Sequence, residues 1–188
     1  LVGEQTMLFG MMTGEIGCGK TLTRAVFTQR LDHRRFAVVT IDNASFSFTE
    51  LLSQVLQDLD GNPPDASQTK FGRVERLKAA AERVHAERRH LVLIFDEAQE
   101  MASSTLNELK LLTNLNQPGR HYLTIVLVGQ PELRTMVAKL PAINQRISLR
   151  FHLNSLDLED AVNYMRHRLK VAGHPTGELF PRDAVERA

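Results

Sequence analysis

The 188-residue chain has one cysteine, no tryptophan and almost no net charge, with 23 Lys and Arg residues against 22 Asp and Glu residues. A single cysteine cannot close an internal disulfide, so the fold must depend on a hydrophobic core, which 43% apolar residues can supply. The longest unbroken aliphatic and aromatic run, residues 91–95, is far shorter than the ~20 residues of a membrane-spanning helix. A net charge of +1 gives no broad field that would capture nucleic acid.

The first residues also lack the basic start and the small-residue cleavage site of a secretory signal. We therefore expect a cytoplasmic protein with no membrane contact encoded in this segment. The sequence starts without methionine and stops just after a new helix begins, so we expect functional segments beyond both ends.

Apolar clusters of strand length alternate with stretches of helical spacing, which is the usual sign of βαβ units around a parallel sheet. The pattern predicts five strands, at residues 7–12, 36–42, 90–96, 121–129 and 148–153. It predicts helices around residues 50–59 and 69–89, one after the third strand with leucines at residues 106–115, and one after the fifth strand with its stripe at residues 158–169. We expect each apolar stripe to face the sheet.

Residues 14–21, GEIGCGKT, match the phosphate-loop pattern G-x-x-x-x-G-K-[ST] without deviation. A predicted strand precedes the motif and an amphipathic segment follows it, so the main-chain N–H groups can surround a polyphosphate at the positive end of a helix. We expect Lys20 to reach the β and γ phosphates of ATP and the Thr21 hydroxyl to bind Mg²⁺. Cys18 is expected to be a small filler of the loop. The predicted nucleotide-binding residues are Gly14, Glu15, Ile16, Gly17, Cys18, Gly19, Lys20, Thr21 and Leu22.

Asp96 and Glu97 follow the apolar residues 91–95 directly. Because side chains alternate along a strand, the two acids should point to opposite faces and perform different tasks. We expect Asp96 to hold the Mg²⁺ shell and Glu97 to orient or deprotonate the attacking water. Without a phosphate loop the same acids would be a helix cap and an acidic first turn; with the loop present, catalysis is favoured.

The strand order supports a second set of site residues. One strand, residues 36–42, lies between the loop and the two acids in sequence, as in P-loop proteins that have an added central strand and a catalytic glutamate. In that arrangement the strand at residues 124–129 should insert between the first and third strands and present Gln130 beside the γ-phosphate. Gln130 is a candidate sensor of the attacking water, with capping of the next helix as the alternative. Arg146 and Arg150 flank the start of the last strand, and either could be an arginine finger or a solvated charge.

The chain resembles the ExeA/GspA-type AAA+ ATPases, which assist assembly of secretion and pilus machinery, and the closely similar TniB-like transposition ATPases. The resemblance covers residues 8–180 and is carried by GEIGCGKT, LVLIFDEAQE, LNELKLLTNLNQPG, IVLVGQPEL, INQRISLRFHL and YMRHRLKVAGH. It implies an α/β P-loop fold of the AAA+ (ASCE) type, with a parallel sheet in the order 5-1-4-3-2 and helices on both faces. It also implies Mg-ATP hydrolysis and a homo-oligomer with shared ATP sites.

Residue by residue, the resemblance implies phosphate binding by Lys20, metal binding by Thr21 and Asp96, catalysis by Glu97, sensor 1 at Gln130 and the arginine finger at Arg146. Residues 1–155 would form the ATPase core. Residues 156–188 would begin a helical lid whose sensor 2 motif the sequence does not contain.

The client stays open between a secretion apparatus and a transposase. A different class of function is a nucleotide-switched scaffold that binds DNA through the basic runs at residues 33–35 and 88–90 and hydrolyses ATP slowly or not at all. A third class, a small-molecule phosphotransferase, would need an acceptor pocket that the sequence does not indicate.

Overall fold

In the computed structural model, residues 7–62, 65, 67–116 and 121–176 are described. Their strands form one parallel sheet in the order β2-β3-β4-β1-β5, which confirms the predicted order. The strands are β1 (Phe9–Gly14), β2 (Phe36–Ile41), β3 (His90–Phe95), β4 (Leu123–Gly129) and β5 (Ile147–Leu153). Because all are parallel, their carboxyl ends meet at one edge of the sheet, where the loop and the two acids were predicted to meet.

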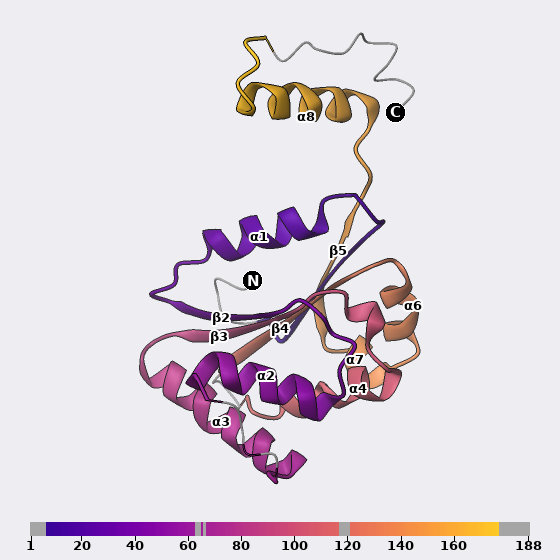
Figure 1. The fold of residues 1–188 in the computed structure, drawn as a ribbon. Helices are drawn as coiled ribbons and strands as arrows, with labels where there is room; N and C mark the ends of the chain where they lie inside the picture. Colours follow the sequence, from indigo (N-terminus) through magenta and orange to yellow (C-terminus); the bar gives the residue numbers. More distant parts are fainter. Residues whose placement is uncertain (1–6, 63–64, 66, 117–120, 177–188) are drawn as a thin grey trace. The chain divides into compact units, whose positions relative to one another are not determined.

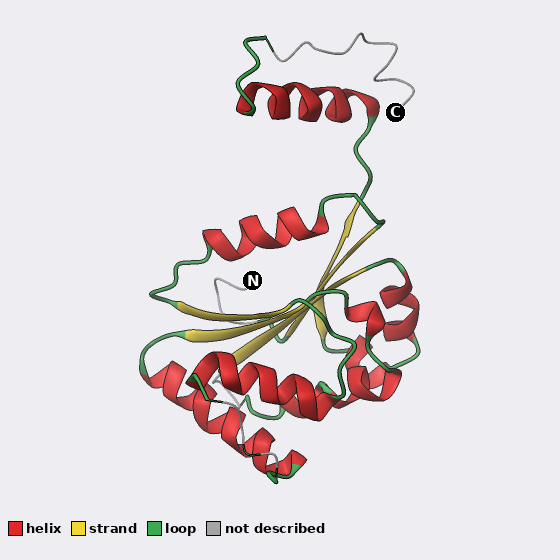
Figure 2. Ribbon diagram, in the orientation of Figure 1, coloured by secondary structure: helices red, strands yellow, loops and turns green. Residues whose placement is uncertain are grey.

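Helices follow the strands in the alternating pattern that the sequence predicts (Figures 1 and 2). They are α1 (Lys20–Arg30), α2 (Phe48–Asp60), α3 (Lys70–Ala86), α4 (Ser103–Glu108), α5 (Lys110–Thr113), α6 (Glu132–Ala138), α7 (Pro141–Asn144) and α8 (Leu158–Val171), with a 3₁₀ turn η1 (Ala98–Glu100). Ser47 and Glu50 form a capping box at the start of α2, which satisfies main-chain donors of its first turn.

The sheet has helices on both faces, as predicted, but the hydrophobic core on one face is larger than that on the other. Figure 1 shows α1 on one face and α2, α3, α4 and α7 on the other. All six residues of β3 are buried and alternate between the layers. Leu91, Leu93 and Phe95 belong to the larger core, whereas Val92 and Ile94 belong to a smaller cluster beside α1. The central strands are thus fixed from both sides.

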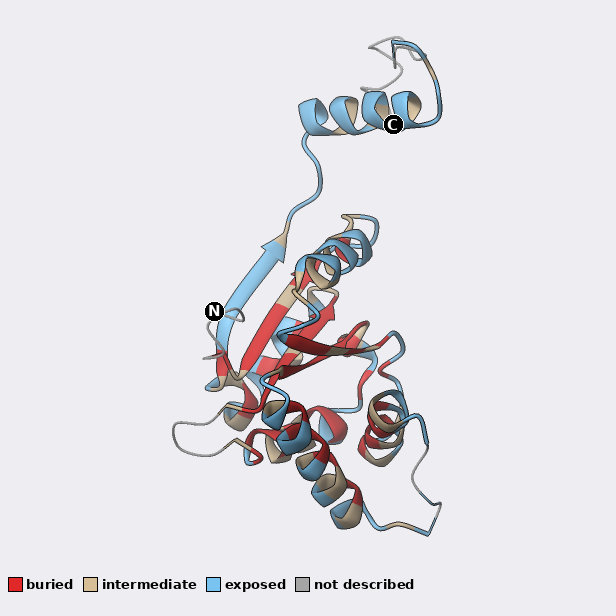
Figure 3. Cartoon of the chain, turned by 90° about the vertical axis from the view of Figure 1, so that its left-hand side faces the viewer, coloured by how far each residue is buried: buried red, intermediate tan, exposed pale blue. Residues whose placement is uncertain are grey.

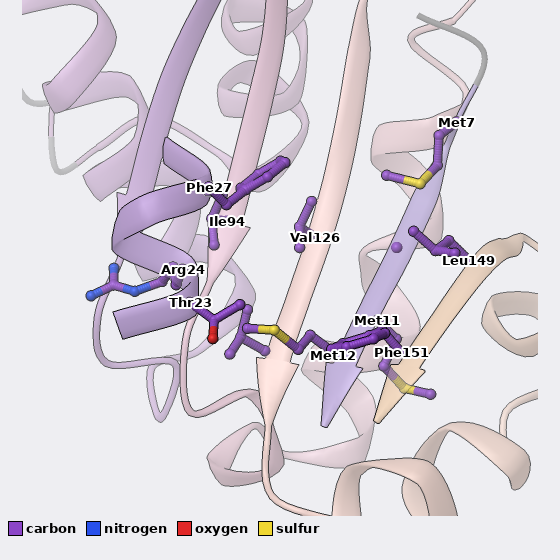
Figure 4. A pocket seen from close by; sticks show the side chains of 12 residues that line it. Met7, Met11, Met12, Thr23, Arg24, Phe27, Ile94, Val126, Leu149 and Phe151 are labelled. Atoms are coloured by element: carbon purple, nitrogen blue, oxygen red, sulfur yellow. The ribbon is translucent and has the colours of Figure 1, made fainter. Parts of the chain in front are cut away.

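The α1 face is apolar and thinly covered toward β5. A pocket there is bordered by Phe27 of α1, Met12 of β1, Val126 of β4 and Phe151 of β5 (Figure 4). Most of β5 is exposed, as its pale blue ribbon in Figure 3 shows, and Phe151 is 53% exposed. β5 is therefore a half-covered edge strand, unlike the four strands beside it.

Two helix predictions need correction. The expected single helix with leucines at residues 106–115 is instead divided into the short helices α4 and α5. Phe71 was expected in the sheet-facing stripe of α3 but is 72% exposed. At 100° per residue, Phe71 lies about 120° around the helix from the fully buried Leu77, which places it outside the stripe.

The chain divides into two compact units, Leu1–Leu153 and Asn154–Ala188. In the second unit, α8 confirms the helix predicted after the fifth strand. Asp157 caps it by accepting the Asp160 N–H at 2.8 Å, and Arg168 and Lys170 lie in its last turn, where they complement the helix dipole. No residue of α8 is buried, and packing of its apolar stripe against the sheet stays a prediction. Within the described part of the chain, no helix has the length and apolarity to span a membrane.

Candidate nucleotide-binding site

The phosphate loop connects the end of β1 to the start of α1. Gly17 and Gly19 have φ angles of +81° and +94°, in the region that residues with a Cβ rarely adopt. A Cβ added to either would meet nothing within 4 Å, so conformation rather than space requires glycine there. Gly19 is the N-cap of α1 and brings no side chain to its first turn. The first N–H groups of α1 are left for an anion, as the motif predicts.

Gly14 is glycine for a different reason, because neighbouring atoms leave no space for a Cβ. A Cβ at Gly14 would lie 2.6 Å from Cys18 Sγ and 2.7 Å from the Leu153 carbonyl oxygen. Cys18 therefore fills the base of the loop against Gly14, which is the small-filler role expected of it. Gly14 and Lys20 are buried, whereas the loop residues at 15–17 and the first helical residues at 21–22 are exposed.

Lys20 points back over the loop that it follows. Its Nζ donates to the carbonyl oxygens of Gly14 at 2.8 Å and Glu15 at 2.9 Å, and only 8% of the residue is exposed. The ammonium is thus already held above the glycine-rich turn. A bound phosphate would offer it stronger, charged acceptors in the same place.

Asp96 lies directly after β3, and its N–H donates to the Ile41 carbonyl oxygen at 2.9 Å. One carboxylate oxygen accepts the Glu97 N–H at 2.9 Å, and the other lies 3.0 Å from Nε of Arg24 on α1. Arg24 also donates to Asp42 at 2.6 Å, beyond the end of β2. This ion pair brings the helix of the phosphate loop against the acid of the third strand.

Burial raises the pKa of the Asp96 carboxyl above its ordinary value. The Glu97 N–H and the Arg24 guanidinium oppose the rise, while the nearby charges of Glu97 and Asp42 add to it. Asp96 is consequently a desolvated acid whose charge is held by one cation and one N–H group.

Glu97 adopts a left-handed conformation, with φ +49° and ψ +39°. The prediction that strand alternation separates the two acids is therefore wrong in its reason, because the extended backbone ends at Phe95. The chain instead turns sharply at Glu97, directly after Asp96. A left-handed non-glycine residue is strained and marks a position held by its surroundings.

Gln130 follows β4 at the same edge. Gly129 is opposite Thr13 of β1, and Leu127 is opposite Phe95 of β3, so β4 inserts between the first and third strands as expected. Gln99 of η1 accepts the Gln130 N–H at 2.9 Å. Pro131 is the N-cap of α6, and no side chain caps this helix by a hydrogen bond.

The two arginines lie elsewhere. Ile147 is opposite Phe9 at the amino end of β1, so Arg146 lies at the far edge of the sheet from the loop; its Nη1 donates to the Ala142 carbonyl oxygen at 2.6 Å. Arg150 does not flank the start of the last strand, as predicted, but is its fourth residue and bonds Asn144 at 2.7 Å. The side-chain hydrogen bonds of the two arginines go to Ala142, Ile147 and Asn144, not to the phosphate loop.

The basic runs considered for DNA lie together, because Phe36 is opposite His90 at the amino ends of β2 and β3. His90 is fully buried and cannot contact DNA, which corrects that part of the hypothesis. Arg34 is paired with Asp32 at 3.1 Å, and Arg89 with Glu87 at 3.3 Å.

The residues present fit Mg-ATP. In the part of the chain that the structure describes, no group of three or more His, Cys, Asp or Glu residues could hold a metal alone. Magnesium needs no such cage, since it keeps several waters and is held by one or two protein ligands together with phosphate oxygens. The buried Asp96 carboxylate, facing α1, and the exposed Thr21 hydroxyl in the first turn of α1 can supply those ligands.

Sequence analysis missed Arg24 and Gln99. Arg24 had a detectable signal, since it lies four residues after Lys20 and so on the same side of α1. Gln99 lies within DEAQE, two residues after Glu97, but nothing in its spacing revealed a contact with β4.

The comparisons with known proteins agree with this geometry. The family model described as "AAA domain" matches residues 4–137. The curated General secretion pathway protein A of Aeromonas hydrophila is 34% identical over 175 residues; the match covers 88% of this chain and 30% of that protein. The chain thus spans about a third of the length of this relative.

Solved structures share the fold at lower identity. The ORC2 protein of Aeropyrum pernix, in its ADPNP-ADP complexes, has a TM-score of 0.69 at 20% identity, over 88% of this chain and 46% of that chain. Cdc6p of Pyrobaculum aerophilum has a TM-score of 0.68 at 19% identity, over 87% and 43%. A Drosophila ORC structure bound to DNA has a TM-score of 0.64 at 21% identity, over 91% and 44%. With a matching loop, sheet order and family model, the chain belongs to the AAA domain family of P-loop ATPases and resembles General secretion pathway protein A.

Proposed function

We propose that this chain binds Mg-ATP at residues 14–22 and hydrolyses it with Glu97. The observation that carries the proposal is the 3.0 Å ion pair between Arg24 and Asp96, because it links the acid that follows β3 to the helix that opens from the phosphate loop. The Gln99 bond to Gln130 brings the end of β4 to the same point.

Each residue then has a defined task. Lys20 and the N–H groups of α1 bind the phosphates, and Thr21 and Asp96 hold the metal ion, which neutralises charge on the phosphate oxygens when bound. Glu97 orients the attacking water and accepts its proton. The side chain of Gln130 contacts the water or the γ-phosphate.

The proposed biological role is to couple ATP turnover to assembly of a larger machine in the cytoplasm. Similarity to General secretion pathway protein A favours a secretion apparatus as the client over a transposase, since that relative is named for secretion.

Self-assembly is part of the proposal. Arg146 lies at the opposite edge of the sheet from its own loop, so it can serve as an arginine finger only toward a neighbouring copy. Residues 156–188, which include α8, would begin the lid over the nucleotide. Shared sites make the rate per subunit rise with protein concentration.

Phosphate release at saturating Mg-ATP tests the proposed chemistry. Glu97→Gln should still bind Mg-ATP but lose turnover by about 10²-fold or more, since it removes the general base. The wild-type rate per subunit should rise with concentration. Glu132→Gln, a change at an exposed acid in the first turn of α6, is the matched control and should keep the wild-type rate.

Equal turnover by Glu97→Gln and wild type would remove the assigned role of Glu97. The DNA-scaffold alternative makes a different prediction in the same assay. It expects negligible phosphate release by wild type, together with ATP-dependent DNA binding that weakens steeply as salt increases.

A further inference from the structure

The side chain of Gln99 connects Glu97 to the end of β4. Its Nε2 donates to Glu97 Oε2 at 2.6 Å, and its Oε1 accepts the Gln130 N–H at 2.9 Å. A carboxylate can only accept and a main-chain N–H can only donate, so these two partners fix the orientation of the amide. One side chain therefore bridges the end of β3 and the end of β4.

The structure leaves room for this bridge at Gly129. A Cβ on Gly129 would lie 2.6 Å from Gln99 Oε1 and 3.1 Å from Cδ2 of Leu133. Gly129 does not have a positive φ, so its backbone does not require glycine. The space that glycine leaves is filled by the Gln99 amide.

Glu97 needs such support. Its left-handed backbone is strained, and the three side-chain torsions of a glutamate would otherwise let the carboxylate rotate. The bond from Gln99 is short and charge-assisted, which makes it one of the stronger kinds of hydrogen bond. It restricts rotation of the Glu97 carboxylate.

We propose that Gln99 is a positioning residue for ATP hydrolysis. It holds the Glu97 carboxylate in its working orientation and ties it to the main chain at Gln130. This inference rests on the proposed function, because it requires Glu97 to act on the attacking water.

Steady-state kinetics of Gln99→Ala and Gln99→Met test the proposal. Both remove the amide, and methionine nearly keeps the volume, so it guards against a loss of folding. We expect kcat to fall about tenfold to a hundredfold while KM and the Kd for Mg-ATP change less than about twofold. Glu100→Gln is the matched control, because Gln99 Nε2 lies 3.4 Å from Glu100, and it should keep the wild-type kcat.

Gly129→Ala tests the same bridge from the other side. The added Cβ should displace Gln99 and lower kcat to a similar degree. In the double variant Gln99→Ala/Gly129→Ala, the two losses should not add, because both act through one side chain. Hydrogen exchange of the Gln130 amide should be faster in Gln99→Ala, which loses the acceptor of that N–H.

The outcomes separate the two proposals. If Glu97→Gln loses turnover but Gln99→Ala and Gln99→Met keep the wild-type kcat, the role of Gln99 is wrong and the proposed function stands. A raised KM with unchanged kcat, or additive losses in the double variant, would also overturn positioning by Gln99. If Glu97→Gln hydrolyses ATP as fast as wild type, the assigned role of Glu97 fails, and positioning by Gln99 fails with it.

Discussion

At the scale of single residues, Arg24 shows how the site is stabilised. Its side chain is 16% exposed and that of Asp96 is 7% exposed, so their 3.0 Å contact is largely shielded from water. A buried carboxylate without its partner lowers the free energy of unfolding. Arg24 therefore stabilises the fold as well as forming part of the site.

We expect Arg24→Met to lower the free energy of unfolding by about 2–3 kcal/mol at pH 8 without nucleotide. The pKa of Asp96 is already raised in the folded chain and should rise further in the variant. Protonation then relieves the cost, so the loss should shrink as the pH falls from 8 to 5. Urea unfolding of wild type, Arg24→Met and Asp42→Asn measures this.

Asp42→Asn is the control, since the Asp42 side chain is 76% exposed and its bond to Arg24 should contribute less than about 1 kcal/mol. An Arg24→Met loss of the same size at both pH values would show that Asp96 is not the group affected.

Sequence predicted residue roles only where a local pattern carries them. Gly17, Gly19 and Lys20 fill a motif whose chemistry lies within eight consecutive residues. Arg24 and Gln99 instead contact Asp96 and Gln130, which lie 72 and 31 positions away in the sequence. Those contacts depend on register, which residue spacing does not contain.

At the scale of elements, β3 begins with a buried polar residue. His90 is fully buried, and its ring nitrogens lie 3.0 Å from the His121 carbonyl oxygen and 2.9 Å from Thr124 Oγ1. Burial lowers the pKa of His90 to about 4; the hydrogen bond to the His121 main chain opposes the fall, and the charges of His121 and His85 add to it. The histidine thus joins β3 to β4 in its neutral form.

Stability should therefore fall as the pH is lowered from about 6.5 to about 4, since the unfolded chain then binds a proton that folded His90 does not. The loss reaches about 1.4 kcal/mol per pH unit at most, or about 3 kcal/mol in all. Free energies of unfolding between pH 7.5 and 4 should show a flatter curve for His90→Gln than for wild type. Parallel curves would assign the acid sensitivity to other groups.

Element order was predictable because alternating strand-length and helical patterns leave few arrangements of a parallel sheet. The division of residues 98–113 into a 3₁₀ turn and two short helices was not predictable. The leucines there keep helical spacing across the breaks, so periodicity alone indicates one continuous helix. Phe71 was misplaced because one apolar residue at the edge of a stripe satisfies the same spacing.

At the scale of the whole molecule, the parallel sheet brings distant segments to one edge. The loop after β1, Asp96 after β3 and Gln130 after β4 meet there because β4 inserts between β1 and β3. The opposite edge holds Arg146, beside the amino end of β5. The fold thus places Arg146 away from the loop of its own chain.

The central claim is that this edge binds Mg-ATP through the phosphate loop. Calorimetric titration of Mg-ATP into wild type, Lys20→Ala and the exposed control Lys139→Ala tests it most directly. We expect saturable binding by wild type and Lys139→Ala, and an affinity at least about tenfold to a hundredfold weaker for Lys20→Ala, because a charge-assisted contact to phosphate is lost. Equal affinities in wild type and Lys20→Ala would contradict the central claim.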